Sequence, residues 1–201
     1  MRPAERIFNT AAGLSVLSWA ALGAALAEPG AGLSPVRICI SLLHVCVGLL
    51  FLLRAPLRQG AGAWGLAAAT LSLPACGTAF LLAPPPGAWP AHAQAVFALG
   101  TGLAALSLGF LGRSFAVLPA LRGLVGTGPY RVIRHPACAG EALMVLACFL
   151  AGIGPAAAGA LLAAGLSLLL RIRIEESFLD RSPEYREYRR RVRWRLLPGL
   201  W

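Results

Sequence analysis

Long apolar runs separated by short polar breaks dominate the pattern along this chain. Four such runs are long enough to form separate helices, at about 7–27, 36–53, 64–83 and 91–112. A helix that crosses a bilayer needs about 20 predominantly apolar residues, so each run can span a membrane. The breaks at 28–35 and 84–90 are rich in Gly and Pro, which end helices and favour turns.

A fifth apolar run, 137–170, decides the predicted architecture. As one straight helix it would reach roughly 51 Å at ~1.5 Å per residue, whereas the hydrocarbon core is only about 30 Å thick. Gly154 and Pro155 interrupt the run near its middle. We therefore expect a helical hairpin with legs at about 137–152 and 156–170, in preference to one long, kinked and tilted helix.

The hairpin has a consequence that a structure can test. It returns the chain to the side it left, so His135 and Glu175 would share one membrane face. The single helix would put them on opposite faces. Arginine placement favours the hairpin, because six crossings put 17 of the 18 arginines on one side and leave only Arg37 on the other. That bias is typical of the cytoplasmic face, and it predicts that both termini are cytoplasmic.

Composition agrees with a membrane protein. The chain is 58% hydrophobic and 13% charged, and the 54 residues between Arg58 and Arg113 carry no charge. A water-soluble domain could not cover its surface with so few charges. We expect an all-α integral membrane protein with about five to six transmembrane helices, the last two forming the hairpin. Residues 1–112 would supply four helices and residues 113–201 a second unit.

The net charge of +10 comes from arginine alone, since the chain has no lysine. No soluble basic domain is present to bind nucleic acid, so basic loops beside membrane helices explain the charge. The five cysteines form no CxxC pair, and we expect buried free thiols and no metal site. Residues 1–30 resemble a cleavable signal peptide, but because further spans follow we expect this segment to be retained.

The stretch "GPYRVIRHPACAG", residues 128–140, stands directly before the hairpin. Pro136 suits the first turn of a helix, which places His135 beside the free backbone N–H groups of a helix N-terminus. Those groups favour anionic or polar ligand atoms. The alternative is a loop in which Arg131 and Arg134 anchor the membrane face. Spacing alone modestly favours the anchoring loop.

A second polar stretch, "RIRIEE" at 171–176, follows the hairpin. Arg171 and Glu175 are four residues apart and share a helix face, which an interfacial ion pair would also explain. Glu141 lies one turn inside the fifth run, where a carboxylate has a high free-energy cost of burial in the membrane. We therefore expect it to be functional or paired with an arginine such as Arg134. His44 could be a polar contact between helices. The charged tail reads as an interfacial helix.

Together these stretches resemble the isoprenylcysteine carboxyl methyltransferase family and its wider membrane methyltransferase superfamily, which includes phospholipid N-methyltransferases. The resemblance covers roughly the last 90 residues. It rests, in order, on "GRSF", "RGLVGTGPYRVIRHP", the two-legged apolar run, "RIRIEE" and "EYREYRRRVRWRLLP". The first 110 residues match only as generic spans. The combination and its spacing are far more specific than any single piece.

The resemblance implies S-adenosylmethionine as methyl donor, bound in a pocket at the cytosolic face, and a lipophilic acceptor from the bilayer. Residues 113–201 would then form the methyltransferase core. The implied cofactor contacts are Arg122, Gly123, Leu124, Val125, Tyr130, His135, Pro136, Ala137, Cys138 and Glu175. Arg171 is the implied substrate-side residue. At Cys138 the family commonly has tyrosine, and this departure bears on cofactor contact and acceptor choice.

This residue set suits the chemistry. Methyl transfer from a sulfonium needs alignment and exclusion of water, because the cofactor carries the activated group. Glu175 could bind donor hydroxyls or its amino group, and Arg171 could hold an acceptor carboxylate with two hydrogen bonds. N-methylation of a phospholipid and S-methylation of a lipophilic thiol are the enzymatic alternatives. A non-catalytic accessory protein or transporter is the alternative outside enzymes. The short chain resembles prokaryotic members, for which the bacterial inner membrane is expected.

Overall fold

A computed structural model describes residues 3–25, 34–56, 59–60, 72, 74–115, 120–121 and 124–201. Their helices are α1 (Pro3–Ala25), α2 (Pro35–Leu53), α4 (Ala91–Leu111), α5 (Pro136–Ala151), α6 (Pro155–Leu179) and α7 (Pro183–Arg191). Residues 74–81 are also helical. Three 3-10 turns lie between these helices, η1 (Pro86–Ala88), η2 (Gly112–Ser114) and η3 (Gly128–Arg131). A two-residue antiparallel pairing of β1 (Gln59–Gly60) with β2 (Ala120–Leu121) is too short to change the predicted all-α class.

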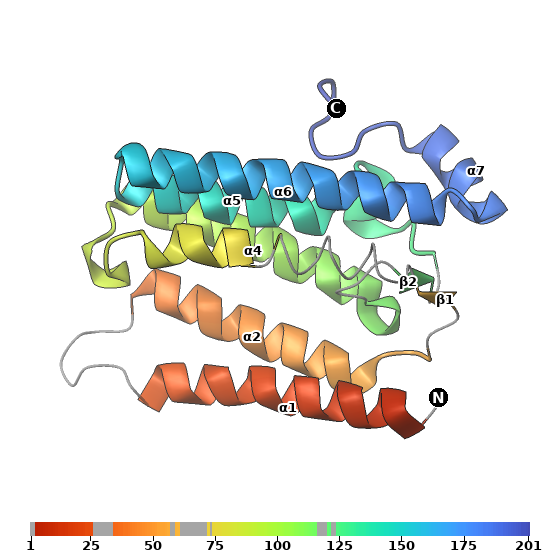
Figure 1. Ribbon diagram of the computed structural model, residues 1–201, viewed down its shortest axis with the longest axis horizontal. Coiled ribbons are helices and arrows are strands. Elements are labelled where there is room, and N and C mark those ends of the chain that lie inside the picture. Colours follow the sequence, from red (N-terminus) through yellow and green to blue (C-terminus); the bar gives the residue numbers. More distant parts are fainter. Residues whose placement is uncertain are drawn as a thin grey trace.

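The helices form a layered bundle (Figure 1). α1 packs on α2, α2 packs on α4, α4 packs most extensively on α5, and α5 packs on α6. The N-terminus and α7 lie at the same end of the bundle in Figure 1, which we call the α7 end. The prediction that the hairpin returns the chain to the side of the N-terminus agrees with this arrangement.

Three of the described helical stretches are long and apolar enough to cross a membrane: α2, residues Ala91–Ser114 and α6. α5 is apolar but shorter. α1, whose run was predicted to span, is not among these three. Of the predicted span at 64–83, residues 64–71 and 73 lie outside the described part of the chain.

The predicted hairpin is confirmed. α5 ends at Ala151 and α6 begins at Pro155, with Gly154 in an extended conformation between them. His135 Nδ1 and Glu175 Oε2 are 4.0 Å apart, which excludes the single long helix. α6 continues past the predicted apolar leg to Leu179, so that Arg171 and Glu175 lie on one helix, as their spacing predicted. Its charged last turns are helical because they pack against the segments that follow.

Close helix contact depends on glycine at two positions. A Cβ on Gly140 of α5 would lie 2.5 Å from the Gly100 oxygen of α4, and a Cβ on Gly100 would lie 2.7 Å from the Gly140 oxygen. Such distances are far below van der Waals contact, so any side chain here would force the backbones apart. The pair sets the spacing of α4 and α5 directly beside Glu141.

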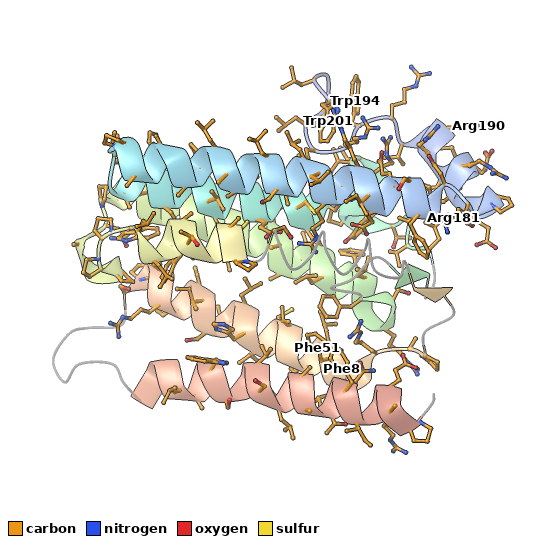
Figure 2. All side chains as sticks on the ribbon, viewed as in Figure 1. Phe8, Phe51, Arg181, Arg190, Trp194 and Trp201 are labelled. Atoms are coloured by element: carbon orange, nitrogen blue, oxygen red, sulfur yellow. The ribbon has the colours of Figure 1, made fainter. Side chains whose placement is uncertain are left out.

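A buried arginine joins the helices at the α7 end. Arg54, just after α2, donates from Nε to the Phe115 carbonyl at 3.1 Å and from a terminal nitrogen to Asn9 Oδ1 at 3.2 Å. Its guanidinium lies 4.8 Å from the Phe51 ring centre, and Phe51 packs edge-on with Phe8 of α1 (Figure 2). These contacts hold Phe115 where it lines the cavity described below.

Candidate methyl-transfer site

One cavity of about 990 Å³ runs from the α7 end into the space between the helices. At the α7 end its walls are polar, and this polar end contains Tyr130, His135, Glu175, Ser182 and Glu184. Deeper in the bundle the walls are apolar, and this apolar arm contains Val16, Ile40, Leu43, Val47, Phe80 and Phe97. His44, predicted as a polar contact between helices, also lines the apolar arm.

Local structure fixes His135 at the start of α5. Pro136 is the first helical residue, and its fixed φ suits that position. The backbone N–H groups of Arg134 and His135 donate to the carbonyls of Trp194 and Arg195 at 2.8 and 2.9 Å. The C-terminal tail therefore pairs with the loop before α5 and holds the His135 ring, which is 6% exposed, against α6.

A buried carboxylate, Glu176, collects the charges around this loop. Arg134 Nε donates to its Oε1 at 2.7 Å, and Arg195 Nε donates to its Oε2 at 2.7 Å. His135 Nε2 lies 3.2 Å and the Tyr185 hydroxyl 3.3 Å from Oε1. Glu176 is thus the centre of an interlocked set, which we call the Glu176 network.

The guanidinium of Arg134 is engaged in hydrogen bonds within the Glu176 network. Besides Glu176, it donates to the carbonyls of Val192 and Arg193 at 2.8 and 2.7 Å. Arg134 is 7% exposed. It therefore ties α6 to the tail and is not the membrane-face anchor, nor the partner of Glu141, that the sequence suggested.

Tyrosines enclose the polar end. The Tyr188 hydroxyl donates to the Tyr130 carbonyl at 2.7 Å, which ties α7 to η3. Burial raises the pKa of Tyr188 to about 12. Burial, together with the nearby Glu176 charge, also raises the pKa of Tyr185. These phenols stay neutral at physiological pH and can serve as hydrogen-bond donors.

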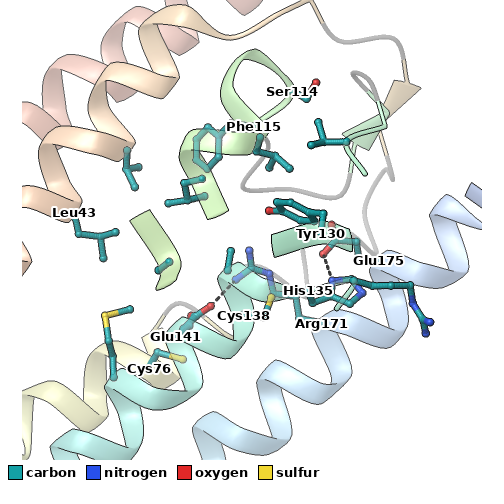
Figure 3. A pocket seen from close by; sticks show the side chains of 18 of the residues that line it. Leu43, Cys76, Ser114, Phe115, Tyr130, His135, Cys138, Glu141, Arg171 and Glu175 are labelled. Atoms are coloured by element: carbon teal, nitrogen blue, oxygen red, sulfur yellow. Dashed lines mark hydrogen bonds and ion pairs between the residues drawn. The ribbon is translucent and has the colours of Figure 1, made fainter. Parts of the chain in front are cut away.

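Glu175 differs from its neighbour because it faces the cavity. Its side chain is 30% exposed, and its Oε2 lies 4.0 Å from His135 Nδ1 (Figure 3). His135 thus approaches Glu176 with one ring nitrogen and Glu175 with the other. Glu175 therefore keeps hydrogen-bonding capacity for a ligand in the cavity.

Arg171 does not form the ion pair with Glu175 that helical spacing suggested. Its terminal nitrogen instead lies 3.4 Å from Glu141 Oε2, across the hairpin. Cys76 approaches the Glu141 carboxylate, and Cys138 lies beside Arg171 (Figure 3). These four side chains, which we call the junction, lie between the polar end and the apolar arm. The expectation that Glu141 pairs with an arginine is confirmed, but with Arg171 as the partner.

The structure brings most of the implied site residues to one cavity. Those that line it are Leu124, Val125, Tyr130, His135, Ala137, Cys138, Arg171 and Glu175. Pro136 is buried and acts through the start of α5. Arg122 and Gly123 lie outside the described residues. Cys138 is buried and occupies a position where tyrosine would be much larger.

Sequence reasoning missed the role of Glu176, although the chain carries a pattern that points to it. Five of the six buried residues of α6 recur every fourth position: Ala160, Ala164, Leu168, Ile172 and Glu176. Residues four apart share a helix face. Glu176 therefore continues a buried apolar stripe and needs buried partners, whereas Glu175 does not lie on that stripe.

The cavity suits S-adenosylmethionine, which combines a sulfonium, an ammonium, a carboxylate, ribose hydroxyls and a purine. Glu175 can accept from the ammonium or the hydroxyls. Tyr130 offers an aromatic face, which attracts cations. The first N–H groups of a helix have no intrahelical acceptor, and those of Ala137 and Cys138 lie in residues that line the cavity.

Comparison with known proteins agrees with this chemistry. Residues 90–185, a little under half of the chain, match a family model described as phospholipid methyltransferase. That family belongs to the membrane methyltransferase superfamily that also includes the isoprenylcysteine carboxyl methyltransferases. No curated protein matches the chain.

The matched region contains the polar end, Glu176 and three of the four junction residues, Cys138, Glu141 and Arg171. The family that it matches is a family of enzymes. The chain is an S-adenosylmethionine-dependent methyltransferase of the membrane.

Proposed function

We propose that this protein transfers the methyl group of S-adenosylmethionine to the polar head of a membrane lipid. One observation carries the proposal: a single cavity joins a polar end to an apolar arm. A water-soluble acceptor would not need the arm, whereas a lipid needs a place for its chain beside its reactive head. The family description, phospholipid methyltransferase, supports the same class of acceptor.

In this arrangement the donor lies at the polar end, with Glu175, Tyr130 and the start of α5 around it. The acceptor's chain lies in the apolar arm, and its head reaches the junction. Bound cofactor supplies an activated methyl group that is ready for in-line displacement. The chain's own residues align the two reactants and keep water away, which accounts for much of the rate in such reactions.

We place the polar end and both termini on the cytoplasmic face, which in a bacterium would be that of the inner membrane. Five to six crossings, with residues 1–112 as a helical scaffold and 113–201 as the catalytic unit, fit the arginine bias. The catalytic unit includes the Glu176 network, which fixes the tail under the cofactor region.

An isoprenylcysteine-like lipid carboxylate is the second candidate acceptor. It is favoured by the Arg171 guanidinium, which lines the cavity beyond the donor region and could hold two carboxylate oxygens. A lipophilic thiol has no comparable partner at the junction among the described residues.

The test is direct. The protein would be reconstituted in nanodiscs with methyl-labelled S-adenosylmethionine and lipids that end in an amine, a carboxylate or a thiol. Label should appear in the extracted lipid fraction, and Glu175→Gln should lower both donor binding and labelling. Saturable donor binding with no label in any lipid would contradict a lipid acceptor.

A further inference from the structure

Three large apolar side chains are exposed in the segment that follows α7, residues 194–201, which we call the C-terminal loop. Trp194, Leu197 and Leu200 are 37%, 54% and 76% exposed (Figure 2). α7 itself offers no such surface, because both of its tyrosines are buried and its other side chains are polar, apart from the first residue, a proline. The apolar surface of the tail therefore belongs to the loop and not to the helix before it.

Hydrogen bonds close the C-terminal loop on itself. The N–H groups of Arg195 and Leu196 both donate to the main-chain oxygen of Trp201, at 2.8 and 3.2 Å. Gly199 has a φ of 86°, which is the left-handed conformation that a glycine adopts without strain. The exposed apolar side chains are thus held on a formed turn, which can present them together to a partner.

The C-terminal loop lies at the level where the apolar part of α6 ends. Its Leu196 and Trp201 pack against Leu168 and Ile172 of α6. Figure 1 shows the tail returning from α7 over α6. Because the apolar run of α6 ends at Leu170, this level corresponds to the boundary between acyl chains and headgroups in a membrane. Tryptophan and exposed leucine are favoured at that boundary.

Exposed arginines lie beside the C-terminal loop. Arg191 and Arg193 directly precede it, and Arg131 lies two residues before Ile133, which pairs with Trp194. Within the part of the chain that the structure describes, no acidic side chain forms an ion pair with these three guanidiniums. Apolar side chains flanked by cations are the pattern that binds an interface containing anionic headgroups.

The loop is also connected to the polar end of the cavity. The carbonyls of Trp194 and Arg195 accept from the N–H groups of Arg134 and His135. The Arg195 guanidinium lies 4.8 Å from the ring centre of Trp201 and donates to Glu176 Oε2 at 2.7 Å. Removal of the loop from α6 would therefore take hydrogen-bond partners from the residues that position the His135 ring.

We propose that the C-terminal loop binds the surface of a bilayer that contains anionic lipids, and that this contact strengthens binding of the methyl donor. A ligand shifts an equilibrium only if it binds one of the two states better. The bilayer binds the state in which the loop is docked on α6, and that state has His135 in place. The inference rests on the proposed donor position, and it does not depend on which acceptor is methylated.

The test measures donor affinity in two bilayers. The protein is placed in nanodiscs of phosphatidylcholine alone, or of phosphatidylcholine mixed with phosphatidylglycerol, which is anionic. Equilibrium binding of labelled S-adenosylmethionine is measured in each, with amide hydrogen exchange of residues 128–140 and 194–201. The anionic bilayer should tighten donor binding about fivefold or more, the factor expected from one arginine at an anionic surface. It should also slow exchange in both segments.

Two variants separate the charged contact from the apolar one. Arg191→Gln/Arg193→Gln should abolish the effect of phosphatidylglycerol on donor affinity. Leu197→Ser/Leu200→Ser should weaken donor binding in both bilayers, because the apolar contact does not depend on headgroup charge. All four side chains are exposed, so the unfolding temperature in detergent should stay near that of wild type.

A matched control removes two arginines elsewhere. Arg6→Gln/Arg113→Gln makes the same change in net charge at two exposed positions, on α1 and η2, and should keep the full effect of phosphatidylglycerol. If this control loses the effect as completely as Arg191→Gln/Arg193→Gln, overall charge and not the loop is responsible. High salt should reduce the effect in wild type, because salt screens exposed charges.

Failure of this inference and failure of the proposed function look different. Equal donor affinity in the two bilayers would overturn the coupling, even if the anionic bilayer slowed exchange in the C-terminal loop. In that case donor binding itself would remain, and with it the proposed donor position. No donor binding in either bilayer would overturn the proposed donor position, and this inference would fall with it.

Discussion

Glu175 and Glu176 are neighbours in the sequence with the same chemical group, yet the fold gives them opposite surroundings. Glu176 is 5% exposed on its side chain, and its oxygens contact two arginines, a histidine and a tyrosine. The Glu175 side chain is 30% exposed, and its ion-pair contact with His135 is 4.0 Å long. A carboxylate whose acceptor sites are filled holds structure together, and one with capacity to spare can bind a ligand.

Helix geometry explains how adjacent residues come to differ. Successive residues on an α-helix are turned by about 100°, since there are about 3.6 per turn. Glu176 continues the buried stripe of α6 toward the tail, and Glu175 turns toward the cavity. The structural role of Glu176 and the binding role of Glu175 can therefore be tested separately by single substitutions at adjacent positions.

The largest effect is expected at Glu176. Glu176→Gln removes the charge that Arg134 and Arg195 share and leaves a buried guanidinium without its counter-ion. Breaking a buried ion pair in this way typically costs about 3–5 kcal/mol of stability. Thermal unfolding in detergent should show a large fall, and donor binding should be lost with it. A stable Glu176→Gln protein that loses only donor binding would show that the two carboxylates do not differ as we describe.

Glu175→Gln should weaken donor binding and leave the stability of the protein nearly unchanged. Because Glu175 is partly exposed and weakly paired, its unfolding temperature should stay near that of wild type. Loss of a charged hydrogen bond to the donor should weaken binding by roughly tenfold or more. Equilibrium binding of labelled S-adenosylmethionine in nanodiscs measures this. Unchanged affinity would remove Glu175 from the donor site, and the exposed Glu187→Gln serves as the matched control.

A smaller loss of stability is expected at Tyr188, whose hydroxyl connects α7 to η3. Tyr188→Phe removes the hydroxyl that donates to the Tyr130 carbonyl and leaves that buried acceptor unsatisfied. The cost should be about 1–3 kcal/mol in unfolding free energy. Denaturant unfolding followed by circular dichroism gives the difference. No loss of stability would mean that η3 does not depend on α7 for its position.

The smallest expected effect is a loss of stability at alkaline pH. Burial raises the pKa of Tyr188 to about 12, above the value of about 10 for an exposed tyrosine. The folded protein therefore binds this proton more tightly than the unfolded chain, so the contribution is complete below about pH 10 and is lost as pH rises toward 12. Stability measured across this range should fall, and the fall should be smaller in Tyr188→Phe. Identical profiles would contradict a buried, protonated Tyr188.

Much of the fold could be predicted because it follows from local pattern. The apolar runs gave α2, α4 and both legs of the hairpin to within a few residues, and Gly154 with Pro155 marked the reversal. Pro136 placed His135 at the start of α5. α6 continues past the apolar second leg to Leu179 and carries Arg171 and Glu175 on one helix, as their spacing predicted.

The sequence by itself determined which segments are helical, that the hairpin returns to the α7 end, and that His135 and Glu175 meet there. These follow from helix periodicity, from chain length against bilayer thickness and from the conformations of Gly and Pro. Only the tertiary structure decided the charge partners: Arg171 with Glu141, and Arg134 with Glu176. Helical spacing brings several carboxylates within reach of each arginine, and the rotation and crossing of the helices select among them.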